Sequence, residues 1–212
     1  MSSEADKALI AEFVEAGKSL YDRGYATGAA GNMSVLLEDG TVLATPSGSC
    51  MGRLDPETLA RVRPDGEQIA GAKATKELRF HLAIYANNPD IRAIVHLHSC
   101  YCTALSCLDN LDVNSVVRPI TPYVVMRMGD IPLVPYYKPG HPGLAEELAR
   151  LAPGHKAFLL ANHGPVTCGK DLTEAVNNAE EFEAACRIYF TLDGHRDHIR
   201  SLTSEEVHQL RK

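Results

Sequence analysis

The sequence predicts an α/β fold in which helices cover a mixed β-sheet. Helical and strand-like patterns alternate along the chain, as they do in α/β proteins. Two hairpin signatures in the N-terminal part imply antiparallel pairing, so the sheet is expected to be mixed. No internal repeat, low-complexity segment or linker divides the 212 residues, and we therefore expect one domain, residues 1–212.

The two hairpins are marked by their turns. Strand-like residues 33–37 and 42–45 flank the turn Glu38-Asp39-Gly40. A second hairpin is expected to turn at Pro64-Asp65-Gly66, another sequence of turn-forming residues.

Helices are predicted before, between and after these hairpins. Residues 4–23 show apolar positions at helical spacing, which stops at Gly24. Asp55-Pro56-Glu57 combines an N-cap residue with a proline at the first helical position. Residues 76–87 form the next predicted helix, with Thr75 as its candidate cap.

The C-terminal half alternates strands and helices. Strands are predicted at residues 93–98, 131–136 and 156–161, and helices at residues 99–108 and 142–151. The two prolines in 131–136 favour an edge position in the sheet. Asp171-Leu172-Thr173-Glu174 resembles a capping box that opens a long helix reaching about Leu192.

Charge and composition exclude several classes of function. The formal net charge is −6 and the Lys and Arg residues are scattered, which argues against a nucleic-acid surface. No apolar stretch is long enough to span a membrane, and the N-terminal sequence lacks the basic region of a signal peptide. We therefore expect a cytoplasmic protein that binds neither nucleic acid nor membranes.

The cysteines do not predict a structural metal site. The six cysteines form no matched pair of CxxC motifs, as a zinc knuckle would require. In the cytoplasm we expect them to be reduced thiols that pack as small hydrophobic side chains.

A candidate metal site begins with His96-Leu97-His98, at the end of the predicted strand 93–98. Side chains two residues apart in a strand point to the same face, so these imidazoles can share one ion. Neutral imidazoles suit zinc and its first-row neighbours. The motif alone equally allows two unrelated histidines on one face.

Two further segments complete a candidate ligand set. His163, followed by Gly164-Pro165, comes just after the apolar strand 156–161. Glu77 falls in the first turn of a predicted helix, where the helix dipole favours a carboxylate, although an ordinary first-turn acid is the alternative. Three histidines and one carboxylate make a tetrahedral set, and displacing the carboxylate would open a position for substrate.

Three segments resemble the class II aldolase/adducin superfamily in their order and spacing. They are Lys76-Glu77-Leu78-Arg79-Phe80-His81, Val95-His96-Leu97-His98-Ser99 and Ala161-Asn162-His163-Gly164. The similarity extends from Gly24 to about Leu192. It implies a three-layer α/β/α sandwich with a mixed, largely antiparallel sheet, assembled as a homotetramer with sites between subunits.

The resemblance also implies roles for individual residues. His96, His98 and His163 become ligands of one divalent ion per subunit, with zinc expected first and Mn²⁺ or Co²⁺ as alternatives. Glu77 becomes both a metal ligand and the proton-transfer residue. Tyr123 aligns with a tyrosine that donates a proton across the subunit interface in fuculose-phosphate aldolases, although a packed aromatic is the alternative.

Three loops are candidates for phosphate binding. In residues 27–34, glycines expose backbone N–H groups, and Asn32 and Ser34 add polar side chains. This loop is neither a Walker loop nor a dinucleotide fingerprint, and a flexible turn is the alternative. In the resembling aldolases, the substrate phosphate is bound by loops that match Gly31-Asn32, Ser47-Gly48 and Thr75-Lys76.

Lys76 departs from the pattern of fuculose-phosphate aldolases, which carry two small hydroxyl residues before the glutamate. A lysine there adds a positive charge beside the candidate metal site, which suits a second anionic group such as a carboxylate. A lysine that faces solvent is the alternative.

A finer resemblance is to the 3-oxo-tetronate 4-phosphate decarboxylases, a branch of the same superfamily. It is carried by residues 23–28, 44–50, 118–129 and 134–140. It implies that a small phosphorylated sugar acid loses CO₂ through a metal-stabilised enediolate, and that protonation of this species gives dihydroxyacetone phosphate. Arg127 is a candidate for binding the departing carboxylate or for stabilising a neighbouring subunit.

Two other functions remain open. A sugar-phosphate aldolase or epimerase would use the same metal site and differ in the group that leaves. A non-catalytic, adducin-like interaction module is expected to lack the metal-binding histidines, which this chain retains.

Overall fold

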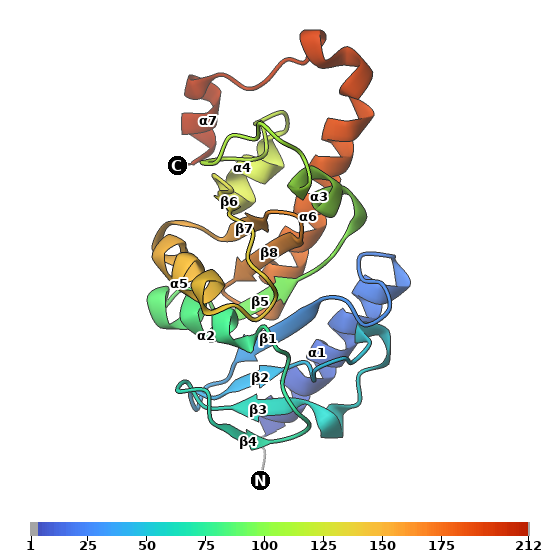
Figure 1. The fold of residues 1–212 in the computed structure, drawn as a ribbon, viewed down its shortest axis with the longest axis vertical. Coiled ribbons are helices and arrows are strands. Elements are labelled where there is room, and N and C mark those ends of the chain that lie inside the picture. The colour runs from blue at the N-terminus through green and yellow to red at the C-terminus, as the bar shows by residue number, and fades with distance from the viewer. Residues whose placement is uncertain (1–3, 212) are drawn as a thin grey trace.

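One eight-stranded sheet organises residues 4–211, the part of the chain that this computed structural model describes, the side chain of Arg196 excepted. The strand order is β4-β3-β2-β1-β5-β8-β7-β6 (Figure 1). The strands are β1 Asn32–Leu36, β2 Val42–Ala44, β3 Ala60–Val62, β4 Gln68–Ala70, β5 Ala93–His96, β6 Leu133–Val134, β7 Ala157–Leu160 and β8 Gly164–Gly169. The pair β6–β7 is parallel and the other neighbouring pairs are antiparallel, which confirms the mixed, largely antiparallel sheet.

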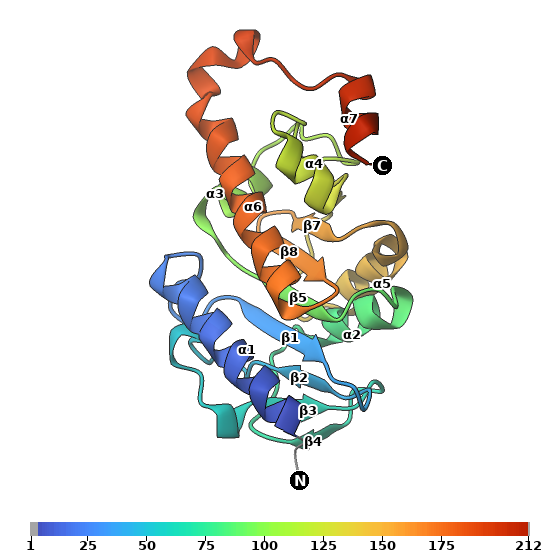
Figure 2. The same cartoon turned by 180° about the vertical axis from the view of Figure 1, so that it is seen from behind.

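Helices cover both faces of this sheet. The α-helices are α1 Glu4–Asp22, α2 Leu78–Asn87, α3 Cys100–Ser106, α4 Pro122–Met128, α5 Pro142–Leu151, α6 Leu172–Thr191 and α7 Ser204–Leu210. Short 3₁₀ turns lie at Met51–Arg53, Pro56–Thr58, Ala152–Gly154 and Asp193–His198. Helices α1 and α6 lie on the face turned to the viewer in Figure 2, and α2 and α5 lie on the opposite face. The three-layer α/β/α prediction is therefore confirmed.

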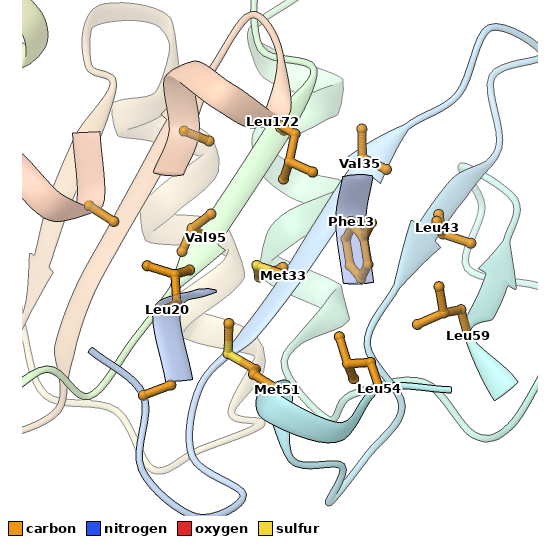
Figure 3. Close-up of a cluster of buried hydrophobic side chains, with 14 of the residues drawn as sticks. Phe13, Leu20, Met33, Val35, Leu43, Met51, Leu54, Leu59, Val95 and Leu172 are labelled. Atoms are coloured by element: carbon orange, nitrogen blue, oxygen red, sulfur yellow. The ribbon is translucent and has the colours of Figure 1, made fainter. Parts of the chain in front are cut away.

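Alternation along the central strands explains the two layers. Ala93 and Val95 of β5 pack toward α1 and α6, whereas Ile94 between them packs toward α2 and α5. Figure 3 shows the first of these clusters, where Phe13 of α1 lies among Met33, Val35 and Leu43. A strand buried on both faces positions its end residues rigidly, and β5 ends at His96.

Both predicted hairpins are present. β1 pairs with β2, and β3 pairs with β4, each in antiparallel register. β6 lies at the edge of the sheet, as its prolines predicted, although it is only two residues long. Asp55 accepts a hydrogen bond from the Glu57 N–H as an N-cap, but the helix it opens is a single 3₁₀ turn.

Three local expectations were wrong. Helix α2 begins at Leu78, two residues later than predicted, and Glu77 rather than Thr75 occupies its N-cap position. At α6, Asp171 caps the Glu174 N–H, but Glu174 accepts from Lys170 instead of completing a reciprocal box. The predicted strand 93–98 ends at His96, so His98 lies in the loop that follows it.

Among residues 4–211, no helix has both the length and the apolar character needed to cross a membrane.

Candidate metal centre

Antiparallel pairing brings the predicted histidines together at one end of the central strands. β1 begins at Asn32, which lies opposite His96, the last residue of β5. His163 immediately precedes β8, whose Val166 pairs with His96 on the other side. Ring nitrogens of His96, His98 and His163 all lie within 4.8 Å of one another. The structure therefore assembles the three predicted ligands from two separate chain segments.

Two glycines allow the loops to approach this closely. A Cβ atom at Gly164 would lie 2.3 Å from the carbonyl oxygen of Leu97, and one at Gly31 would lie 2.8 Å from that of His96. Both distances are shorter than any tolerable van der Waals contact, so neither position accepts a side chain without backbone movement.

The tautomer of His96 is set by the backbone. Its Nδ1 lies 2.8 Å from the carbonyl oxygen of Pro165, which can only accept a hydrogen bond, so Nδ1 carries the ring proton. The side chain is fully buried, and burial lowers the pKa of the imidazole, which keeps it neutral. Nε2 therefore carries no proton, and its lone pair can bind a metal ion. This atom faces His98 and Glu77.

Glu77 is the fourth side chain of the cluster. Its Oε2 lies 3.3 Å from Nε2 of His96, and its Oε1 lies 3.4 Å from Nε2 of His163. Burial raises the pKa of this carboxyl, whereas the hydrogen bond from Asn32 lowers it, as positive charge on the neighbouring histidines would. The net shift is downward, so the buried carboxylate stays ionised.

The donor set fits a divalent first-row ion. Three imidazoles and one carboxylate are ordinary ligands of a tetrahedral zinc site. Oε1 of Glu77 is buried and accepts no hydrogen bond from the described residues, an arrangement that a bound cation would compensate. His96, His98, His163 and Glu77 would hold the ion.

The second and third predicted phosphate loops lie side by side. Pro46 and Ala74 form an isolated antiparallel bridge, and the Thr75 N–H donates to the Thr45 carbonyl oxygen. Ser47 and Thr75 are half-buried and Gly48 is exposed. Thr75 is two residues before Glu77, and its Oγ1 accepts a hydrogen bond from the Glu77 N–H at 3.3 Å. These loops therefore reach the candidate metal centre through Glu77.

The first predicted phosphate loop reaches the centre through Gly31, but two of its side chains have other partners. Asn32 donates from Nδ2 to Oε2 of Glu77 at 2.7 Å, and its Oδ1 lies 2.7 Å from Nε2 of His81. Ser34 is fully buried and hydrogen-bonds His81 and Tyr85. The expectation that the Ser34 side chain helps to cradle a phosphate is wrong, because no ligand could reach it.

Lys76 and Tyr123 are both exposed. Lys76 lies in the turn before α2 and shares a shallow pocket with Glu77, Gly140 and His141. Tyr123 lies on α4 with 59% of its surface accessible. The roles assigned to these two residues stay predictions.

The sequence analysis assigned no role to His81. This side chain is fully buried and bound to Asn32, which in turn binds Glu77. Its position four residues after Glu77 was a usable signal, because residues at that spacing share one face of a helix.

A family model described as Class II Aldolase and Adducin N-terminal domain matches residues 11–190. The chain belongs to this family. Class II aldolases use a divalent metal ion, and the histidine cluster of this family member provides a place for one.

Relatives within the class II aldolase family match nearly the whole chain. A 3-oxo-tetronate 4-phosphate decarboxylase of Escherichia coli O6:H1 is 56% identical over 209 residues, 99% of this chain and 98% of that protein. An L-fuculose phosphate aldolase of Methanococcus maripaludis is 37% identical over 185 residues, 87% of this chain and 97% of that protein. The crystal structure of YgbL from Escherichia coli superposes with a TM-score of 0.97 at 53% identity, covering 99% of this chain and 100% of that one.

Proposed function

We propose that this chain is a metal-dependent carboxy-lyase that converts a 3-oxo-tetronate 4-phosphate to dihydroxyacetone phosphate and CO₂. The observation that carries the proposal is the 56% identity, over 99% of the chain, to a decarboxylase of that name. The cluster of His96, His98 and His163 beside the buried Glu77 supports it, because this reaction needs an electrophile next to a proton carrier.

The metal ligands are His96, His98 and His163, with Glu77 as the displaceable fourth. Zinc is the ion that suits three neutral imidazoles, and Mn²⁺ or Co²⁺ would fit the same donors. When bound, the ion supplies Lewis acidity to substrate oxygens and so stabilises the negative charge that develops as CO₂ leaves.

The remaining chemistry is a proton transfer. The bond between the carboxylate carbon and C2 breaks, and its electron pair stays on the C2 side, next to the C3 ketone. A proton added at C2 then gives dihydroxyacetone phosphate. Glu77 is the carboxylate inside the cluster, and we assign its Oε1, which accepts no hydrogen bond from the described residues, to take up a proton from water and deliver it to C2. Tyr123 of a neighbouring subunit is the second candidate donor.

Phosphate binding falls to the loops that surround Glu77. Backbone N–H groups at Gly31, Asn32 and Gly48 and hydroxyls of Ser47 and Thr75 are the groups we assign to the phosphate. For Asn32 the assignment rests on the backbone, because both ends of its side-chain amide are engaged. Lys76, next to Glu77 and exposed, is assigned to the substrate carboxylate.

We also propose the oligomeric state and the cellular location of the enzyme. We expect residues 1–212 to act as one catalytic domain, in a cytoplasmic homotetramer with Tyr123 at a contact between subunits. The exposed apolar side chains of Tyr123 and Met126 on α4 suit such a contact.

A class II sugar-phosphate aldolase is the second candidate, because an L-fuculose phosphate aldolase is 37% identical over 87% of this chain. The two reactions differ in the leaving group, which is CO₂ in one and an aldehyde in the other. The test incubates metal-loaded protein with a 3-oxo-tetronate 4-phosphate and, separately, with ketose 1-phosphates. We expect CO₂ from the sugar acid at a much higher kcat/KM than aldehyde from any ketose phosphate, and the reverse ranking would establish the aldolase.

A further inference from the structure

A line of buried and half-buried polar side chains leads from Glu77 into the contact between α2 and β1. Glu77, the N-cap of α2, is followed at four-residue spacing by His81 and Tyr85 of that helix, and Asn32 and Ser34 lie two residues apart on β1. Four-residue spacing on a helix and two-residue spacing on a strand each keep side chains on one face, so the two sets meet across the helix–sheet contact. We call these five residues the polar ladder.

The two elements alternate along the polar ladder. Asn32 Nδ2 lies 2.7 Å from Glu77 Oε2, and Asn32 Oδ1 lies 2.7 Å from His81 Nε2. His81 Nδ1 then lies 2.7 Å from Ser34 Oγ, which lies 2.8 Å from the hydroxyl of Tyr85. Four consecutive hydrogen bonds therefore join the candidate metal centre to the core.

The Asn32 amide fixes the direction of these bonds. Its NH₂ group donates to Oε2 of Glu77, and its carbonyl oxygen faces Nε2 of His81. A carbonyl oxygen only accepts, so Nε2 of His81 carries the proton. Burial lowers the pKa of His81 to about 3, so the ring is neutral and its Nδ1 accepts from the Ser34 hydroxyl. Ser34 in turn accepts from Tyr85.

Burial limits the access of water to three of these groups. Ser34 and His81 are fully buried, Asn32 is 5% exposed, and the ring of His81 stacks on Phe80 with centroids 4.5 Å apart. In such a site an unmade hydrogen bond is costly, and a fully satisfied network holds one arrangement. If one of these hydrogen bonds is broken, the side chains between it and Glu77 are therefore no longer held in a single orientation.

We propose that His81, Ser34 and Tyr85 are positioning residues that act through Asn32 to hold the Glu77 carboxylate in one orientation. Oε2 is held by the Asn32 amide, and Oε1 stays directed at His163 and the ion site. This inference rests on the proposed function in so far as Glu77 carries the proton. Because proton transfer depends steeply on the position of the donor, disorder in Glu77 lowers turnover more than it lowers binding.

The kinetic test compares His81→Leu with His81→Gln in the zinc-loaded enzyme. Gln can place an amide N–H near the position of the His81 Nε2 proton and donate to Asn32, whereas Leu cannot. We expect His81→Leu to lower kcat by about 10- to 100-fold with KM and bound zinc unchanged, and His81→Gln to recover most of that loss. Equal losses in the two variants, or a loss that follows zinc content or melting temperature, would overturn the proposal.

Tyr85→Phe tests the far end of the polar ladder and carries the kinetic test if His81→Leu does not fold. It removes one hydroxyl and keeps the ring, and we expect kcat to fall by about 2- to 10-fold with zinc content unchanged. An unchanged kcat in Tyr85→Phe would remove Tyr85 from the proposal and count against the transmitted effect.

A spectroscopic measurement tests the hydrogen bonds of the polar ladder independently of catalytic activity. In ¹⁵N NMR of histidine-labelled protein, His81 is expected with a protonated Nε2 and a bare Nδ1. The opposite tautomer would overturn the proposal even if CO₂ release were normal. If the wild-type protein releases no CO₂ but His81 shows the expected tautomer, the proposed substrate is wrong and the proposed hydrogen bonds of the polar ladder are confirmed.

Discussion

At the scale of single residues, the candidate metal centre depends on the geometry around Glu77. This carboxylate is buried among histidines, with Oε1 lacking a hydrogen-bond donor among residues 4–211. A buried, unpaired carboxylate is costly unless a cation compensates it. The metal is therefore expected to stabilise the fold as well as to support chemistry.

His163→Ala is expected to abolish both bound metal and activity, because it removes one of three imidazoles that converge on the site. Metal content is measured by elemental analysis after dialysis, and activity by CO₂ release. His155→Ala serves as the matched control, because His155 follows the Ala152–Gly154 turn and bonds the Leu151 carbonyl oxygen outside the cluster. Full metal content in His163→Ala would refute the ligand assignment.

Lys76→Met is expected to lower kcat/KM by about 10- to 150-fold, because it removes the charged contact that we propose to the substrate carboxylate while keeping much of the stem. Dihydroxyacetone phosphate lacks that carboxylate, so its binding should change far less. Lys170→Met is the control, since Lys170 is an exposed lysine before α6.

The outcomes for Lys76 distinguish three roles. If product binding falls as steeply as turnover, Lys76 binds the phosphate, and the carboxylate must be held by another group such as Arg127. If neither quantity changes, Lys76 is a solvated surface lysine.

The sequence predicted the cluster of three candidate metal ligands, which the structure brings together, better than it predicted their surroundings. His96, His98 and His163 could be chosen because strand ends and a glycine mark them. The partners of Asn32 and Ser34 could not be predicted, because a strand pattern says which face a side chain takes and not which helix covers that face. Four-residue spacing from Glu77 to His81 indicated a shared helix face, but not the burial that makes His81 important.

At the scale of secondary structure, the loop after the histidine pair is held by α6. Glu183 accepts hydrogen bonds from Ser99 Oγ at 2.7 Å, Tyr101 N at 2.8 Å and Cys102 N at 2.9 Å. These bonds fix the first turn of α3, which begins two residues after His98. Glu183 therefore stabilises the segment that carries His98, one of the candidate metal ligands.

Glu183→Ala is expected to destabilise the protein by about 2–3 kcal/mol, because it removes charge-assisted hydrogen bonds to a helix start. The melting temperature is the readout, and a fall of roughly 5–10 °C is expected for a chain of this size. Glu180→Ala is the matched control on the same helix, since Glu180 forms a partly exposed ion pair with Arg23 that is worth about 1 kcal/mol or less. Equal effects in the two variants would contradict the role of Glu183.

Sequence patterns did not predict β8 or α4. β8 was missed because it begins with Gly164-Pro165 and ends with Gly169, residues that usually mark turns. It forms because β5 and β7 pair with it on both sides. α4 was missed because it is short and begins at Pro122, so it shows too few turns for a helical period. Both elements depend on tertiary contacts that local sequence does not reveal.

At the scale of the whole molecule, the proposed homotetramer requires a subunit contact, and we assign exposed apolar side chains to it. Tyr123 and Met126 on α4 are 59% and 57% exposed, and Tyr136 is 61% exposed. Met126→Glu is expected to lower the mass of the assembly and to abolish activity, because burying a charge at a subunit contact is costly. Light scattering measures the mass.

Ile69→Glu is the control for this experiment. Ile69 is 43% exposed on β4, at the opposite end of the sheet from β6 (Figure 1), and its replacement should leave mass and activity unchanged. An active wild-type monomer at assay concentration would remove Tyr123 from the mechanism, and an unchanged mass in Met126→Glu would place the contact elsewhere.

The central claim is that metal held by the histidine cluster drives loss of CO₂ from a phosphorylated sugar acid. Its most direct test follows a 3-oxo-tetronate 4-phosphate labelled with ¹³C at the carboxylate, using metal-free protein and the same protein after zinc is restored. We expect ¹³CO₂ and dihydroxyacetone phosphate in about a one-to-one ratio from the restored protein, and neither product from the metal-free protein. Equal CO₂ release with and without metal, or dihydroxyacetone phosphate formed while the label stays in another product, would contradict it.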